Sequence, residues 1–159
     1  MKDSSANFIA RDYSHYVTYR VSQLNAGLNT HAARLLKEQC GLSLVQWRLL
    51  ALVAGAEPVT SAQLVDAIAM DSGQFSRNLK ALIQDGLIIS TVDKADHRRH
   101  LLSLSKEGRG KFNSAEPVMR ERREALLSGV SAADKAAFFR TLDQLERNLQ
   151  PEPVSKSYA

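Results

Sequence analysis

The side chains most able to do chemistry lie on one face of a short helix predicted to begin near residue 72. Gln74 matches the edge of adenine, Arg77 matches guanine or a phosphate, and Lys80 is better placed for a nucleic-acid backbone. Small residues line the start of this helix: Ser72, Gly73 and Ser76. They permit close approach, and the unpaired N–H groups of a helix start favour a phosphate. An ordinary solvent-exposed face explains the same residue types, so the neighbouring elements must decide between the two interpretations.

A second charged group occupies residues 92–100, which read VDKADHRRH. Its candidate binding residues are Lys94, Asp96, His97, Arg98 and Arg99. Because Arg98 and Arg99 are adjacent, an extended chain sends them to opposite faces, so one can enter a minor groove while the other meets a phosphate. The carboxylate of Asp96 can steady the Arg98 guanidinium by a bidentate pair. The competing interpretation is an ordinary charged turn.

Helix-capping signals predict the elements that position these residues. A side-chain oxygen three residues before a glutamine is the capping-box spacing, and it occurs at Ser43–Gln46, Thr60–Gln63 and Asp71–Gln74. Helices are therefore expected from about residues 44, 61 and 72, the last of them ending at Gly86. Apolar runs at 87–89 and 101–104 predict a two-stranded hairpin around the charged tip. A helix, a tight turn, a second helix and such a wing can fill a DNA major groove and grip the neighbouring backbone.

Longer helices are predicted on both sides of this region. Residues 9–39 lack proline, and a seam with alternating spacings of four and three runs through Val17, Val21, Leu24, Leu28, His31 and Leu35. Gly41 is expected to cap this helix in the left-handed conformation. The seam spacing recurs at Phe138, Leu142, Leu145 and Leu149 until Pro151 stops the last helix. Two such seams exceed the need of one small core, which favours homodimerisation through both ends of the chain.

The remaining helix is expected from Lys106 to about residue 128, with Pro117 bending it or marking a restart. Within it, Arg120, Arg122 and Arg123 alternate with glutamates, which favours a solvent-exposed face of salt bridges.

Composition sets the outer limits of the interpretation. A chain of 159 residues fits one domain, and its net charge of +4 with a pI near 9.4 is compatible with an anionic partner. One cysteine excludes an intrachain disulfide framework and suggests a reducing compartment. No apolar run approaches a membrane span, and the first residues lack a secretory core, so we expect a cytoplasmic protein without a membrane partner.

The residues also resemble a known family, the MarR winged-helix transcriptional regulators. The family's wing signature, Asp-x-Arg, five residues and Leu-Thr, is matched by Asp96-His97-Arg98, RHLLS and Leu104-Ser105, and Gly108 follows as expected. The segments LSLVQWRLLALV and MDSGQFSRNLKALIQDGLI match as well, and so do the long terminal helices. One departure is Ser90, where the family often has a basic residue.

The resemblance implies a homodimer that binds a pseudopalindromic DNA operator, usually as a repressor relieved by a small molecule or an oxidant. It implies base contacts from the face between Ser72 and Lys80 and insertion of Arg98 into the minor groove. The expected fold is mainly α with a small β-wing, a single domain over residues 1–159. Within it, residues 43–105 would form the DNA-binding region, and residues 8–40 and 106–150 the helical dimerisation region.

The family places its effector cleft between the dimerisation helices and the winged region. By this resemblance, Tyr16, Arg20, Trp47 and Arg48 are candidates to hold an aromatic carboxylate. The competing interpretation is core packing for Trp47 and interface packing for the tyrosines.

Other sensing chemistries have simpler explanations. Cys40 has only Lys37 as a nearby cation in sequence, which favours a packed, inert thiol over a redox switch. His97 and His100 surround two arginines that oppose a metal cation, and His31 on the seam is more typical of a packed histidine than of a pH sensor. We therefore expect no metal and no cofactor.

The sequence predicts a DNA-binding transcriptional regulator, with a winged-helix protein-interaction module as the alternative. It contains no Gly-rich phosphate loop, nucleophile motif or metal-ligand spacing, so an enzyme is not expected.

Overall fold

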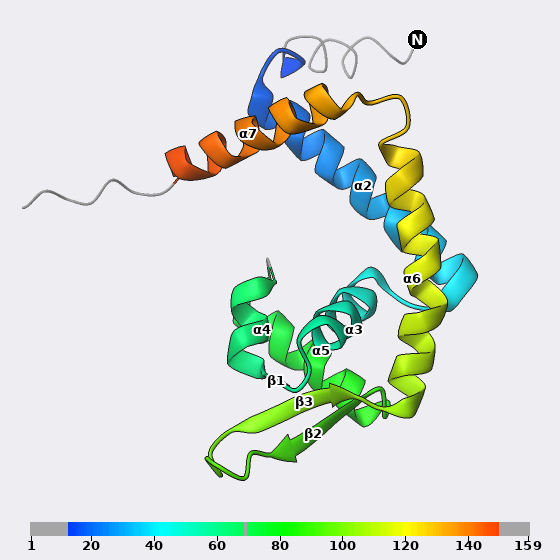
Figure 1. Ribbon diagram of the computed structural model, residues 1–159, viewed down its shortest axis with the longest axis vertical. Coiled ribbons are helices and arrows are strands. Elements are labelled where there is room, and N and C mark those ends of the chain that lie inside the picture. Colours follow the sequence, from blue (N-terminus) through cyan, green and yellow to red (C-terminus); the bar gives the residue numbers. More distant parts are fainter. Residues whose placement is uncertain (1–12, 69, 150–159) are drawn as a thin grey trace, which may run out of the picture. The chain divides into compact units, whose positions relative to one another are not determined.

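The computed structural model describes residues 13–68 and 70–149, with only the backbone of Asp66. The chain divides into two compact units, Met1–Arg122 and Arg123–Ala159, which are described in turn. The first contains α2 (Val17–Cys40), α3 (Leu44–Ala56), β1 (Val59–Thr60), α4 (Ser61–Ala67), α5 (Ser72–Gln84), β2 (Ile88–Val92), β3 (His100–Leu104) and most of α6 (Lys106–Leu126) (Figure 1). The second contains the end of α6 and α7 (Ala132–Leu149). The mainly α fold with a small β-wing is confirmed.

The capping signals located the short helices correctly. α3, α4 and α5 begin directly after Ser43, Thr60 and Asp71, and each of these side chains accepts a hydrogen bond from the backbone N–H three residues later. At Ser43 and Thr60 the glutamine side chain in turn accepts from the backbone N–H of the cap residue, which completes the capping box. These local bonds satisfy backbone groups that a helix start leaves unpaired.

The ends of α2 differ in how well the sequence predicted them. Gly41 adopts the expected left-handed conformation with φ of 65° and closes the helix. The start was predicted too early: residues 14 and 15 form a turn, and Tyr16 is extended with φ of −83° and ψ of 123°. The seam spacing itself begins only at Val17. The part of this prediction before residue 13 lies outside the described residues, as does Pro151.

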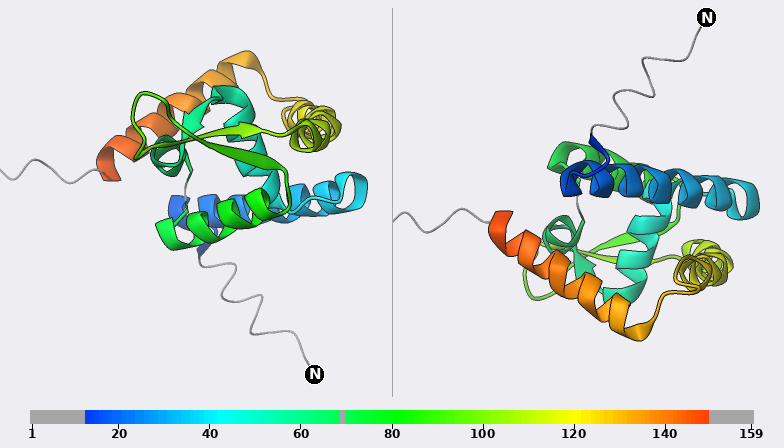
Figure 2. Two further views of the ribbon diagram at one scale, coloured as in Figure 1. Left: turned by 90° about the horizontal axis from the view of Figure 1, so that it is seen from below. Right: turned by 90° about the horizontal axis from the view of Figure 1, so that it is seen from above.

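Three strands form one antiparallel sheet in the order β1-β3-β2. The expected hairpin is present, with Ile88 opposite Leu104 and Val92 opposite His100. The two-residue strand β1 was not predicted. It pairs with β3 through Val59 opposite Leu102 and Thr60 opposite Leu101. Figure 2 gives two further views of this hairpin and of the helices of the same unit.

The hydrophobic core of the first unit is built around α3, in which four residues are buried: Trp47, Leu49, Leu50 and Val53. The end of α2, the helices α4 and α5, and the strands β2 and β3 complete it with Leu36, Leu64, Phe75, Leu82, Ile88 and Leu102. Trp47 stacks on Phe112 of α6 at a centroid distance of 5.5 Å, and Cys40 is buried. Core packing of Trp47 and a packed Cys40 thiol are therefore confirmed.

α6 approaches the sheet very closely at its first turn. Gly108 is buried, and a Cβ atom there would lie 1.9 Å from the carbonyl oxygen of Leu87. Ser105 binds the same segment of backbone, since its N–H donates to Leu87 O at 3.1 Å and its hydroxyl donates to Gly86 O at 2.6 Å. Pro117 lies inside one continuous helix, so no restart occurs there.

One sequence-based interpretation of a side-chain environment was wrong. Arg122 is not on a solvent face, because it is partly buried and its Nη2 donates to the Leu28 carbonyl of α2 at 2.7 Å. His31, on the seam of α2, is exposed in the single chain, and its packing stays a prediction. Of the salt bridges expected on α6, Arg120 pairs with Glu116 at 3.2 Å.

The apolar seams lie on the surface of the single chain. Val17, Val21 and Leu24 of α2 are exposed. In the second unit, α7 has no buried residue, and Phe138 and Leu149 are exposed. Across the residues described, no helix has both the length and the apolarity that a bilayer span requires.

Candidate nucleic-acid interface

α5 turns one face to the core and the other to solvent. Phe75, Leu79 and Leu82 are buried, and the six residues predicted to contact DNA are all exposed: Ser72, Gly73, Gln74, Ser76, Arg77 and Lys80. Because residues three and four apart share a helix face, burying one set fixes the direction of the other. The tertiary structure thus presents the predicted base-reading side chains together on one surface.

In the first turn of α5, Gly73 leaves space beside the Asp71 carboxylate. A Cβ atom at Gly73 would lie 3.3 Å from Asp71 Oδ1 and 3.6 Å from Arg77 Nη1. The Asp71 carboxylate caps the helix through the Gln74 N–H at 2.8 Å. Among the described residues the Gln74 side chain does not return this bond, so its amide remains available to a base edge.

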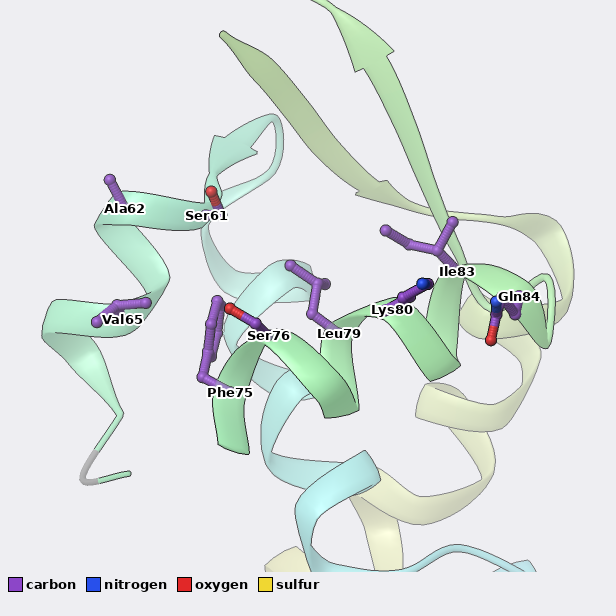
Figure 3. A pocket seen from close by; sticks show the side chains of 9 residues that line it. All are labelled: Ser61, Ala62, Val65, Phe75, Ser76, Leu79, Lys80, Ile83 and Gln84. Carbon is purple, nitrogen blue, oxygen red and sulfur yellow. The ribbon is translucent and has the colours of Figure 1, made fainter. Parts of the chain in front are cut away.

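A groove runs along the side of α5 that faces α4 (Figure 3). Its volume is about 520 Å³, and its apolar lining includes Val65 of α4 and Phe75, Leu79 and Ile83 of α5. Ser76 and Lys80 of the predicted DNA-contacting face also line it. Ser76 and Lys80 therefore border the groove between α4 and α5.

The wing carries its charged residues at an exposed tip. Lys94, Asp96, His97, Arg98 and Arg99 are all exposed. The tip is shaped by local hydrogen bonds, in which Asp93 Oδ1 accepts from Ala95 N–H at 2.9 Å and Asp96 Oδ1 accepts from Arg98 N–H at 3.0 Å. Short side chains of this kind stabilise turns by bonding the backbone two residues on.

The expected pair between the Asp96 carboxylate and the Arg98 guanidinium is wrong. Asp96 binds the backbone of Arg98 instead, because two residues of separation in a turn bring the carboxylate to the N–H group. No salt bridge holds the Arg98 guanidinium within the described part of the chain. Its charge therefore remains available to a polyanion.

Ser90, the departure from the family pattern, lies on the wing beside His100. Its hydroxyl is 3.1 Å from His100 Nδ1. The two strands of the hairpin are thus linked here by a short polar contact between side chains.

The candidate effector residues are only partly brought together. A cavity of about 530 Å³ is lined by Trp47 and Arg48, together with Ala51, Leu52, Ala67, Ile68 and two asparagines of α2, Asn25 and Asn29. Arg48 Nη2 donates to Asn29 Oδ1 at 2.7 Å, and Asn29 Nδ2 donates to Asn25 Oδ1 at 3.3 Å. Tyr16 and Arg20 do not line this cavity.

Sequence reasoning missed Asn25 and Asn29 because it followed aromatic and cationic residues. The available signal was their spacing of four, which places both amides on one face of α2. For metals, no group of three or more potential ligands occurs among the residues that the structure describes.

Comparison with known proteins finds one family whose model matches part of the chain. The model of the MarR family matches residues 41–99, which include α3, α4, α5 and the wing tip. This region of the chain, which holds the helix-turn-helix and most of the wing, is thus similar to the MarR family.

Relatives agree with this similarity. The HTH-type transcriptional regulator BilQ of Clostridium symbiosum is 28% identical over 114 residues, which are 71% of this chain and 77% of BilQ. The fold is similar to the Staphylococcus aureus MepR–DNA complex, with a TM-score of 0.78 at 19% identity over 86% of this chain and 99% of MepR. PcaV of Streptomyces coelicolor, in complex with its natural ligand, gives a TM-score of 0.72 at 15% identity over 94% of this chain and 100% of PcaV. The curated relatives that match over about 70% of this chain are HTH-type transcriptional regulators.

Proposed function

We propose that this chain is a MarR-family transcriptional regulator, which binds duplex DNA with α5 in the major groove and Arg98 in the adjacent minor groove. The observation that carries the proposal is the exposure of two cationic groups held by one core: Arg77 and Lys80 on α5, and Lys94, Arg98 and Arg99 at the wing tip. In this proposal residues 43–105 form the DNA-binding region.

The chemistry of the two groups differs. Gln74 and Arg77 can form bidentate hydrogen bonds to adenine and guanine edges, so α5 reads sequence. The hairpin is narrow, and the minor groove reports mainly A·T against G·C and its own width, so Arg98 adds affinity with little base identity. The fold similarity to MepR, which was solved in complex with DNA, supports this arrangement.

The proposed binding unit is a homodimer on a pseudopalindromic operator. Residues 8–40 and 106–150 would form its dimerisation region. Val17, Val21 and Leu24 leave an apolar stripe exposed on α2, and soluble monomers rarely keep large contiguous patches of this kind in water. Leu145→Asp in α7 should give monomers or aggregates and abolish operator binding. A stable wild-type monomer at micromolar concentration in light scattering would contradict the dimer.

The proposed effector site is the cavity lined by Trp47 and Arg48, and the regulator is a repressor that its ligand releases from DNA. Arg48 offers a cation and Trp47 an aromatic edge, a combination that suits a planar aromatic carboxylate. The likeness to PcaV, which was solved with its natural ligand, supports a ligand-responsive fold.

Benzoate is a simple probe of this site. It should quench the fluorescence of Trp47, the chain's one tryptophan, and weaken DNA binding, and both effects should be reduced in Arg48→Ala. Unchanged DNA affinity at saturating benzoate would remove this ligand class from the proposal.

The decisive test of DNA binding is a titration of random duplexes, followed by enrichment of the tightest binders, at several salt concentrations. We expect an inverted repeat to be enriched and the binding constant to fall linearly with salt on logarithmic axes. The alternative protein-interaction module predicts no enrichment and no salt-sensitive affinity for duplex DNA.

A further inference from the structure

The carboxylate of Glu57 lies where three elements of the first unit meet. Glu57 follows α3 as its C-cap, and its side chain is 20% exposed. One oxygen, Oε2, accepts from the backbone N–H of Leu104 at the end of β3 at 2.7 Å. The other oxygen, Oε1, pairs with Nη2 of Arg109 in the first turns of α6. A single side chain thus joins α3, the wing strand and α6.

The sheet register explains why a side chain is needed at this point. β1 pairs Val59 with Leu102 and Thr60 with Leu101, so two more residues of an antiparallel ladder would place residue 57 opposite Leu104. The backbone cannot continue this ladder, because Pro58 has no N–H and the N–H of Glu57 already donates to Val53 O at 2.9 Å. The Glu57 carboxylate takes the place of the missing strand.

Because of its position, the contact between Glu57 and Leu104 can affect the orientation of the wing. Leu104 is the last residue of β3, and the charged tip precedes the other end of the same strand at His100. Five residues of strand span about 13 Å from first to last, so a rotation of about 10° at the base moves the tip by roughly 2 Å. Such a shift is enough to break a hydrogen bond to DNA, whose donor–acceptor distance varies within about half an ångström.

We propose that Glu57 is a positioning residue for DNA binding, which holds the base of β3 so that Arg98 reaches the minor groove. This inference rests on the wing contact in the proposed function. Glu57 acts through the Leu104 backbone and through Arg109, and it makes no contact with DNA itself. Both of its bonds are charge-assisted, which makes them stronger than the neutral bonds of the hairpin.

A double-mutant cycle of Glu57→Ala with Arg98→Ala tests the inference. Arg98→Ala should weaken binding about tenfold, and Glu57→Ala should weaken it about three- to tenfold in the wild-type background. In the Arg98→Ala background Glu57→Ala should have an effect of less than about twofold, because the contact that it positions is already gone. A residue that only stabilises the fold would not show this dependence on Arg98 when each folded variant is titrated well below its melting temperature.

Glu38→Ala is the matched control. It also removes one carboxylate per chain, from an exposed pair with Arg34 on α2. Loss of negative charge alone should leave DNA affinity equal or slightly increased, so weaker binding by Glu57→Ala has the opposite sign to the general charge effect. Glu57→Gln keeps an acceptor for the Leu104 N–H and should bind more tightly than Glu57→Ala.

The outcomes separate the two proposals. If Arg98→Ala binds like wild type, the wing contact of the proposed function fails, and this inference fails with it. If Arg98→Ala weakens binding but Glu57→Ala does not, or weakens it equally in both backgrounds, only the positioning role is overturned. Should Glu57→Ala not fold, Arg109→Gln replaces it in the cycle, with the same supporting and opposing results.

Discussion

The helix α5 and the wing are the two halves of the proposed DNA-binding surface, and different forces hold them. α5 buries Phe75, Leu79 and Leu82 in the core along its whole length, and each such side chain contributes about 1.5–3 kcal/mol. The wing is buried only near its base, at Ile88, Leu102 and Leu104. Beyond that point the backbone ladder of β2 and β3 holds the hairpin, and the polar bonds of Glu57 and Ser105 fix its base.

Because of this difference, mutations can disturb the DNA contact of α5 and that of the wing separately. The orientation of α5 is coupled to the stability of the whole unit, because the same side chains supply both. The orientation of the wing depends on contacts that contribute less to folding, so it can change while the chain remains folded.

The largest expected effect comes from the buried side of α5. Phe75 is 2% exposed, and Phe75→Ala should lower the free energy of unfolding by about 3–5 kcal/mol and abolish DNA binding with it. Val92→Ala on the exposed wing strand is the control and should change stability by less than about 0.5 kcal/mol. Urea denaturation followed by circular dichroism measures both, and equal losses in the two variants would contradict the comparison.

Gly108 and Gly110 test the close contact at the base of the wing. The Cβ of Gly108→Ala would meet the Leu87 carbonyl, whereas nothing lies within 4 Å of one at Gly110. We expect Gly108→Ala to destabilise the chain by about 1–3 kcal/mol and Gly110→Ala to stabilise the helix by about 0.5–1 kcal/mol. Thermal unfolding of the pair decides this, because the two variants add the same atom to the same helix and should shift the melting temperature in opposite directions.

Arg77 should separate sequence reading from affinity. Arg77→Ala should cost about 1–3 kcal/mol of binding and relax the preference at one position of each half-site, as expected of a bidentate contact to guanine. Arg98→Ala should instead weaken binding to all sequences and reduce the salt slope by roughly one. Titration against single-base variants of the operator distinguishes them. Uniform weakening by Arg77→Ala would reassign this residue to phosphate.

The smallest effect is expected at Asp96. Its carboxylate shapes the tip by accepting from the Arg98 N–H, so Asp96→Ala should weaken binding less than Arg98→Ala does, by about threefold. Removal of a negative charge acts in the opposite direction and limits the loss. Affinity above that of wild type would show that charge outweighs turn geometry at this position.

Local signals in the sequence determined the helix starts, the left-handed cap at Gly41 and the hairpin. Each of these depends on residues within a few positions of one another: Ser43 with Gln46, Thr60 with Gln63, and the apolar runs around the charged tip. The same locality made the exposed face of α5 predictable, because helical periodicity fixes which side chains share a face. That these residues bind DNA remains a prediction.

Only the tertiary structure decided the contacts between distant segments. β1 is two residues long and pairs only because β3 lies beside it. Arg122 donates to Leu28, and Arg48 reaches Asn29, because the helices that carry them pack together in the first unit. Glu57 contacts Leu104, which lies 47 positions later in the sequence, and Arg109, which lies near the start of α6. No local pattern encodes such pairs, since their energy exists only after the hydrophobic core has placed the elements side by side.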